Sequence, residues 1–279
     1  LTADQGARVI AQQCAVHDGA QGGALGANGA SFSFWHVFCC RAAAAGLELR
    51  TGATAFLDSC CIFDNGRVGI AVWSNAGMLE ARRCEVHSHE NESGVMVMET
   101  AQTATFKDCT LYGNNYCGAA VQKNGSIRLL RCKVHDNLEG ILVQGSGCAK
   151  IEHCNVFNNN ANGIFVGFSH TGTASILNNE VYGNTSKGIL LGSGSNDRVT
   201  LRDNKERSNR GLPPGHMPWG AKERCSEFRQ TWEKGNTREW AKAVKKNAKA
   251  DNVFAAYLDG REASFAAGLQ SPEDTILSC

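Results

Sequence analysis

Apolar and polar residues alternate in short runs that recur along most of the chain. "IRLLRCKVHDNLEGILV" (127–143) and "AKIEHCNVFNNNANGIFV" (149–166) each show an alternating run, a polar corner, a Gly and a second alternating run. Period-two alternation predicts β-strands, and corners rich in Asn and Gly predict tight turns. Helical repeats would need apolar stripes with a period near 3.6 residues, which these segments lack.

The runs repeat at a regular interval. From Cys60 onward one position holds Cys or Asn with spacings of 24, 25, 23, 22, 25 and 25 residues. A period of this length is typical of a repeat solenoid. Three short strands per repeat predict a right-handed parallel β-helix of about nine 22–25-residue coils over residues 1–209, about 40 Å long at ~4.8 Å per coil.

The recurring Cys and Asn position predicts an internal ladder that stabilises the solenoid. Parallel side chains give poor disulfide geometry, so we expect buried, reduced thiols. Reduced thiols favour a cytoplasmic or nuclear location, whereas three N-x-S sequons leave a secreted location open. The ladder consists of Cys14, Cys60, Cys84, Cys109, Cys132, Cys154, Asn179 and Asn204.

Residues 210–279 differ in composition from the repeats. Three of the four Pro lie in "RGLPPGHMPWG" (210–220), and apolar residues then recur at helical spacing, as at Trp240, Val244 and Ala248. This pattern predicts a linker followed by an α-helical C-terminal cap or flank. Residues 205–251 carry 12 Lys and Arg against 6 Asp and Glu, which we interpret as a solvated helical face.

The phrase C-x-V-x-x-N…G-I-x-V, at Cys132–Val143 and Cys154–Val166, resembles the parallel β-helix repeat of pectate-lyase-like proteins. Its Cys-rich form resembles the β-helical domain of the F-box proteins that select substrates for ubiquitin ligases. The resemblance covers about residues 7–209. It implies the fold, and it allows either a binding scaffold or an enzyme acting on sugar polymers.

The strand after each Gly carries the active-site face in enzymes of this fold. From the strand that follows Gly69 onward, the outward side chains of these strands form two rows, and neither row holds a carboxylate. Neither the paired carboxylates of a glycosidase nor a set of oxygen ligands for Ca²⁺ can be assembled there. No catalytic residue, metal ligand or cofactor is therefore predicted. The rows are Ala71, Met96, Ala120, Leu142, Phe165 and Leu190, then Trp73, Met98, Gln122, Gln144, Gly167 and Gly192.

Two sets of outward residues are candidates for contact. An apolar strip of Trp73, Met96, Met98, Leu142, Phe165 and Leu190 predicts an exposed surface covered by a protein partner or by the chain's own C-terminal segment. A row of rings, three residues after the ladder, predicts stacking between coils or a platform for sugars or peptides. It comprises His17, Phe63, His87, Tyr112, His135, Phe157 and Tyr182. "HSHENE" (87–92) is interpreted as a solvated turn.

The leading hypothesis is a non-catalytic scaffold for protein–protein interaction, and the resemblance adds substrate recognition for a ubiquitin ligase. The alternative is a polysaccharide-active lyase, epimerase or hydrolase, or a carbohydrate-binding protein. Convergence of Asp58 and Asp108 with Arg83 or Lys107 in a cleft would favour the alternative. A net charge of +1 gives no argument for nucleic acid, and no apolar run is long enough for a transmembrane segment.

Overall fold

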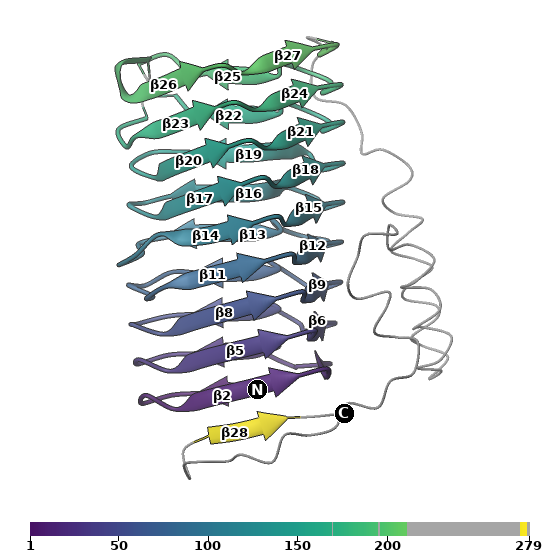
Figure 1. The fold of residues 1–279 in the computed structure, drawn as a ribbon, viewed down its shortest axis with the longest axis vertical. Helices are drawn as coiled ribbons and strands as arrows, with labels where there is room; N and C mark the ends of the chain where they lie inside the picture. The colour runs from purple at the N-terminus through teal and green to yellow at the C-terminus, as the bar shows by residue number, and fades with distance from the viewer. Residues whose placement is uncertain (169, 195, 211–273, 278–279) are drawn as a thin grey trace, which may run out of the picture.

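The computed structural model describes residues 1–168, 170–194, 196–210 and 274–277. These residues form a parallel β-solenoid of nine coils, in which each coil contributes one strand to each of three sheets (Figure 1). All strand pairs between successive coils are parallel and in register. The predicted fold class is thus confirmed for the solenoid. The one helix described is the 3₁₀ turn η1 (Asn196–Arg198).

The strands of each sheet lie one coil apart along the chain. Sheet A contains β1 (Thr2–Ala3), β4 (Ala24–Gly26), β7 (Leu47–Leu49), β10 (Ile70–Val72), β13 (Val95–Met98), β16 (Cys117–Gln122), β19 (Glu139–Val143), β22 (Ile164–Val166) and β25 (Ile189–Leu191). Sheet B contains β2 (Arg8–Gln12), β5 (Ser31–Trp35), β8 (Thr54–Asp58), β11 (Leu79–Arg82), β14 (Ala104–Lys107), β17 (Ser126–Leu130), β20 (Cys148–Glu152), β23 (Ala174–Leu177), β26 (Val199–Arg202) and β28 (Asp274–Leu277). Sheet C contains β3 (Ala15–His17), β6 (Phe38–Cys40), β9 (Cys61–Phe63), β12 (Glu85–His87), β15 (Thr110–Tyr112), β18 (Lys133–His135), β21 (Asn155–Phe157), β24 (Glu180–Tyr182) and β27 (Lys205–Arg207).

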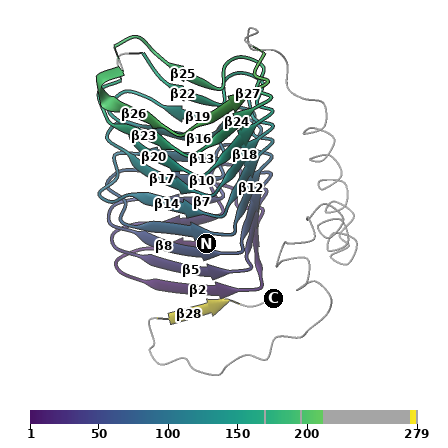
Figure 2. The ribbon, with the colours of Figure 1, turned by 45° about the horizontal axis from the view of Figure 1, so that its top comes forward.

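Strand β28 was not expected from the sequence. It pairs in parallel with β2 and extends sheet B beyond the first coil (Figures 1 and 2). A paired strand protects the open end of a sheet, which would otherwise expose unpaired backbone groups. The predicted C-terminal helices fall in residues 211–273, outside the described residues. Within the described part of the chain, no helix has the length and apolar character needed to cross a membrane.

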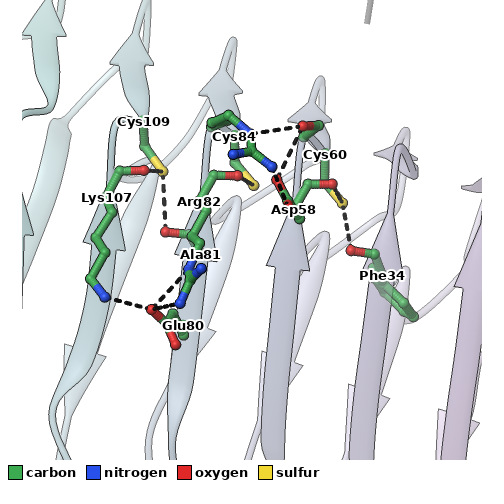
Figure 3. Close-up of polar contacts among 11 residues, drawn as sticks. Phe34, Asp58, Cys60, Glu80, Ala81, Arg82, Cys84, Lys107 and Cys109 are labelled. Atoms are coloured by element: carbon green, nitrogen blue, oxygen red, sulfur yellow. Dashed lines mark hydrogen bonds and ion pairs between the residues drawn. The ribbon is translucent and has the colours of Figure 1, made fainter. Parts of the chain in front are cut away.

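The predicted ladder lies inside the solenoid at the corner between sheets B and C. Its six Cys and Asn179 are buried, and the eleven Cys in the described residues are free thiols. Four of these thiols, as in Cys60 Sγ to Phe34 O at 3.4 Å, bond to a backbone carbonyl of the preceding coil (Figure 3). Asn179 takes the same place and donates from Nδ2 to Ile151 O at 3.0 Å. Cys and Asn are therefore interchangeable here because both can donate to that carbonyl.

A second internal ladder occupies the corner between sheets C and A. The amide of Asn137 donates to Leu111 O at 3.2 Å and to Asn159 Oδ1 at 3.1 Å. The backbone N–H of Asn137 also donates to Asn159 Oδ1, at 3.1 Å. Each buried amide is thus satisfied by the coils on both sides, which buried polar groups require. The rungs are Asn65, His89, Asn114, Asn137, Asn159, Asn184 and Asn209.

The interpretation of "HSHENE" as a solvated turn is wrong for its two histidines. His87 and His89 are 2% and 0% exposed. His87 points outward from sheet C, but the rings of the coils above and below cover its two faces. His89 is a rung of the second ladder, where its Nδ1 accepts a hydrogen bond from the backbone N–H of Asn65 at 3.2 Å.

Candidate functional site

The outward rows of sheet A align as predicted, but they do not form an exposed apolar surface. Successive strands pair Ala71 with Met96 and Ala120 with Leu142. Ala71, Ala120 and Leu142 are buried at 0%, 4% and 8% exposure. The other large apolar residues of the strip, Trp73, Met96, Met98, Phe165 and Leu190, are half-buried.

The strip is partly buried because neighbouring side chains pack over it. Ala45 and Val68, from the turns before β7 and β10, pack on Ala71. Cys117 packs with Ala120 and Leu142 in a second small cluster. Among the large exposed hydrophobic residues of the described chain, Phe168 packs its ring against Phe165 of the strip, whereas Leu1, Met78, Tyr116 and Leu201 are not members of it.

A carboxylate does occur in this face, one coil before the rows considered in the sequence. Glu48 is the register partner of Ala71 and accepts a hydrogen bond from Trp73 Nε1 at 2.8 Å. Arg50 forms an ion pair with Glu48, and its guanidinium lies 5.9 Å from the centre of the Trp73 ring. Glu48 is thus paired with Arg50, and Glu139 in β19 lies four strands away in the same sheet, so the two do not form the close pair of carboxyl groups that glycoside hydrolysis needs.

The predicted row of rings forms a continuous stack along sheet C. From Phe63 to Tyr182, successive ring centroids lie 5.4, 4.5, 5.2, 4.6 and 5.1 Å apart, with interplanar angles of 15° or less. His17 is followed in register by Cys40 rather than by a ring. Because each ring is stacked on its neighbours, mainly the edges of the rings remain accessible to a ligand. This geometry favours stacking between coils over a platform for sugars.

The carboxylates and cations whose convergence in a cleft would favour the alternative instead form separate ion pairs between neighbouring coils. Arg83 forms an ion pair with Asp58, and Arg131 binds Asp108 with a 2.7 Å contact. Lys107 contacts Glu80 at 2.7 Å (Figure 3). The hydrogen bond from Arg131 holds the pKa of Asp108 below its usual range. Asp108 therefore stays ionised and is poorly suited to act as a general acid.

A groove of about 800 Å³ lies instead on the outer face of sheet B. It crosses β14, β17, β20, β23 and β26, which rise one above another in Figure 1. Five strands at a spacing of ~4.8 Å make the groove about 19 Å long. One row of register partners runs along it, with one side chain per coil: Thr105, Arg128, Lys150, Ser175 and Thr200.

A second row and the η1 turn complete the lining. Ser126 and Cys148 are register partners, with Thr103 and Thr173 in the flanking coils. The hydroxyls of Thr103 and Ser126 lie 2.8 Å apart. Asp197 and Arg198 line the groove near its C-terminal end. The groove therefore presents hydroxyl groups, which both donate and accept hydrogen bonds, together with fixed cations.

Glu152 holds the two central cations in place. Its Oε2 accepts a hydrogen bond from Arg128 Nη2 at 2.9 Å, and its Oε1 lies 3.2 Å from Lys150 Nζ. Partial burial opposes ionisation of Glu152, but the hydrogen bonds from Lys150 and Arg128 outweigh it and lower its pKa. The side chains of Arg128 and Lys150 are 37% and 49% exposed, so both remain accessible from the groove.

Towards the N-terminal end the same face becomes aromatic. Glu80 precedes Thr105 in the row, and Phe56 precedes Glu80. The rings of Trp35 and Phe56 lie 5.9 Å apart, and Arg82 lies over Phe56 at 5.5 Å. Both rings are half-buried. An aromatic surface therefore continues the line of the polar groove along the solenoid axis.

Sequence reasoning missed this groove, although a usable signal was present. The sequence analysis considered the residues that come after the Gly or after the Cys and Asn ladder position in each repeat. The groove residues come before the ladder position in each repeat. Hydroxyl, thiol and cationic residues occupy alternate positions there, in "TATFK" (103–107), "SIR" (126–128), "CAK" (148–150) and "TAS" (173–175). Applying the period-two rule to this strand would have placed them on one face.

The fold and groove define a right-handed parallel β-helix protein with a polar surface along its axis. The family model for the right-handed β-helix region matches residues 71–206. No curated protein sequence matches the chain. The match covers slightly less than half of the chain, so with the structure it supports the right-handed β-helix fold.

Several solved structures share this architecture. Pectate lyase Pel9A matches with a TM-score of 0.51 and 11% identity, over 76% of this chain and 73% of its own. The A-module of mannuronan C-5 epimerase AlgE6 from Azotobacter vinelandii matches with a TM-score of 0.51 and 13% identity, over 74% and 69%. The periplasmic alginate epimerase AlgG matches with a TM-score of 0.50 and 13% identity, over 66% and 51%. At these identities the likeness shows the fold.

These comparisons contradict the leading hypothesis from the sequence. The structural neighbours are a pectate lyase and alginate epimerases, which are polysaccharide-active proteins. Neither they nor the family match supports the F-box likeness or the role as a ubiquitin-ligase scaffold. Because many functions use this repeat, its Cys-rich form was a poor guide to function.

Proposed function

We propose that this protein binds an acidic polysaccharide along the outer face of sheet B. The observation that carries the proposal is the register-aligned row Thr105, Arg128, Lys150, Ser175 and Thr200 in an open groove. A linear polymer has a repeating structure, and so has this surface, with one outward side chain every ~4.8 Å. A chain lying along the axis meets side chains at equivalent positions of successive coils.

The chemistry of the lining favours a polymer that carries carboxylates. The hydroxyls of Thr105, Ser175 and Thr200 suit sugar hydroxyls, which also donate and accept hydrogen bonds. Arg128 and Lys150 can bind carboxylates through charge-assisted hydrogen bonds, which are stronger than neutral ones. Pectate and alginate, the polymers named for two of the structural neighbours, are of this acidic class.

The groove supports binding better than hydrolysis. Asp197 is the one carboxylate among its lining residues, and the nearby Glu152 is kept ionised by Arg128 and Lys150. Hydrolysis of a glycosidic bond generally requires two carboxyl groups, one of them protonated. We therefore assign the groove a binding role, and a hydrolytic centre would have to use other residues.

Isothermal titration calorimetry with polygalacturonate and alginate tests the proposal, with dextran as the neutral control. We expect both acidic polymers to bind and dextran to bind more weakly, with affinity falling as salt is added. Lys150→Gln or Arg128→Gln should weaken binding roughly tenfold, because one charge-assisted hydrogen bond contributes about 1.5 kcal/mol. Lys133→Gln removes an exposed cation of sheet C and is the matched control.

Two results would overturn the proposal. One is failure of the full chain to bind either acidic polymer. The other is equal weakening by Lys150→Gln and Lys133→Gln, which would indicate attraction by net charge rather than by the groove. NMR spectra of each polymer after incubation with the protein test separately for elimination or epimerisation.

A further inference from the structure

We propose that Cys61, Glu85 and His87 form a zinc-binding site on the outer face of sheet C. Cys61 lies in β9 and is the register partner of Glu85 in β12. His87 follows Glu85 by two residues, so both side chains leave the strand on the same face. The site lies on a different sheet from the polysaccharide groove and does not depend on the function proposed for that groove.

The donor atoms of Cys61 and His87 have the separation that a zinc site requires, and a carboxylate oxygen of Glu85 lies close to both. One donor atom from each residue lies within 4.8 Å of the other two. Cys61 Sγ and His87 Nε2 are 3.5 Å apart. Tetrahedral zinc, with bonds of about 2.3 Å to sulfur and about 2.05 Å to nitrogen, places such donors about 3.6 Å apart. The Cys and His pair is therefore already spaced for coordination, and rotation of the Glu85 side chain supplies the third donor.

The surroundings fix the orientation of the His87 ring. Its Nδ1 lies 2.8 Å from Ser88 Oγ. When Nδ1–H donates to that hydroxyl, the lone pair of Nε2 faces Cys61, and zinc-binding histidines are commonly oriented in this way. Phe63 and Tyr112 stack on the two faces of the ring, with centroids 5.4 and 4.5 Å away. The ligand is thus held in position before a metal binds.

Burial and charge also suit a divalent cation. His87 is 2% exposed, and Cys61 and Glu85 are half-buried. The Tyr112 hydroxyl donates to Glu85 Oε2 at 3.3 Å. A thiol, a carboxylate and an imidazole match the ligand types of zinc, and three protein ligands leave a fourth position for water. On binding, the S–H bond of Cys61 breaks, a bond from sulfur to zinc forms, and one proton passes to solvent.

This set of ligands belongs to one pair of coils. Two coils further on, His135 occupies the same ring row, but Thr110 and Lys133 stand at the positions of Cys61 and Glu85. His135 therefore shares the stacked environment of His87 without the other two ligands. It provides a control in the same protein that separates coordination from ring stacking.

Titration of the full chain with ZnCl₂, followed by calorimetry and native mass spectrometry, tests the site. We expect one ion per chain, with proton release visible as a dependence of the heat on the buffer. His87→Phe keeps a ring in the stack, as Phe63 and Phe157 do naturally, and should weaken binding at least about tenfold, as should Cys61→Ser and Glu85→Gln. His135→Phe should bind zinc as the wild type does.

Cobalt substitution gives a second readout that identifies the ligand. Co²⁺ in place of zinc should give a thiolate-to-metal charge-transfer band, which Cys61→Ser abolishes and His135→Phe retains. Circular dichroism spectra of each variant report whether it is folded. The proposal is wrong if the wild type binds no zinc, or if folded His87→Phe and Cys61→Ser bind it as tightly as the wild type.

Discussion

Replacing His89 by Asn should make the stability of this protein less sensitive to mild acid. His89 is fully buried in a ladder whose other rungs are Asn. Its Nδ1 accepts a hydrogen bond from Asn65, where other rungs use an amide oxygen. In the neighbouring coils the rung amide donates to the middle residue of the preceding sheet C strand, as from Asn114 to Val86 O. Asn at position 89 could make the equivalent bond to Ile62 O.

The magnitude follows from the pKa of the buried ring. Burial lowers the pKa of His89 from 6.5 to about 4. Between these values the unfolded chain binds a proton that the folded chain does not, so stability falls as the pH falls through this window. The full shift corresponds to about 3 kcal/mol. Between pH 7 and pH 5, the loss assigned to His89 is about 2 kcal/mol.

Urea unfolding at pH 7 and pH 5, followed by Trp fluorescence, measures this loss. The free energy of unfolding should fall by about 2 kcal/mol more in the wild type than in His89→Asn. His153→Asn, at an exposed histidine, should behave as the wild type. An equal loss in the wild type and His89→Asn would refute the reasoning, as would an NMR titration in which the His89 ring protonates near pH 6.5.

Three further changes test other parts of the structure. Asn137→Ala should lower the free energy of unfolding by about 3 kcal/mol, because it leaves buried backbone and amide groups without their hydrogen-bond partner. Asn115→Ala, at an exposed position, should change it little. Leu142→Asp should cost about 3 kcal/mol or more and lower the melting temperature, since Leu142 is 8% exposed. Polygalacturonate should slow alkylation of Cys148, which lines the groove, but not of Cys61 on sheet C, as followed by site-resolved mass spectrometry.

The sequence contained most of the information needed for the fold. The spacing of the Cys and Asn ladder set the coil length, and alternation located the strands. The second ladder was missed because Asn in a corner is explained well enough by turn formation. That the amides of residues such as Asn137 are buried follows only when coils are stacked and each amide finds partners in the next coil.

Contacts between coils explain why the candidate site was harder to predict. Arg83 pairs with Asp58, and Arg128 with Glu152, across 25 and 24 residues. Whether such residues meet or stay apart depends on register, since a shift by one residue moves a side chain to the opposite face. The pairing of β28 with β2 joins segments more than 260 residues apart, and no local pattern indicates it.

The regularity of the solenoid explains why its outer faces can take different roles. Stacked coils satisfy their own backbone and corner groups, so outward positions are under little pressure from the core. On sheet C this freedom is used for ring stacking, with Cys61 and Glu85 added beside one ring. On sheet B it is used for hydroxyls and cations in register. Because that row repeats with the coil, it suits a ligand that also repeats, which is the physical reason to test a polymer first.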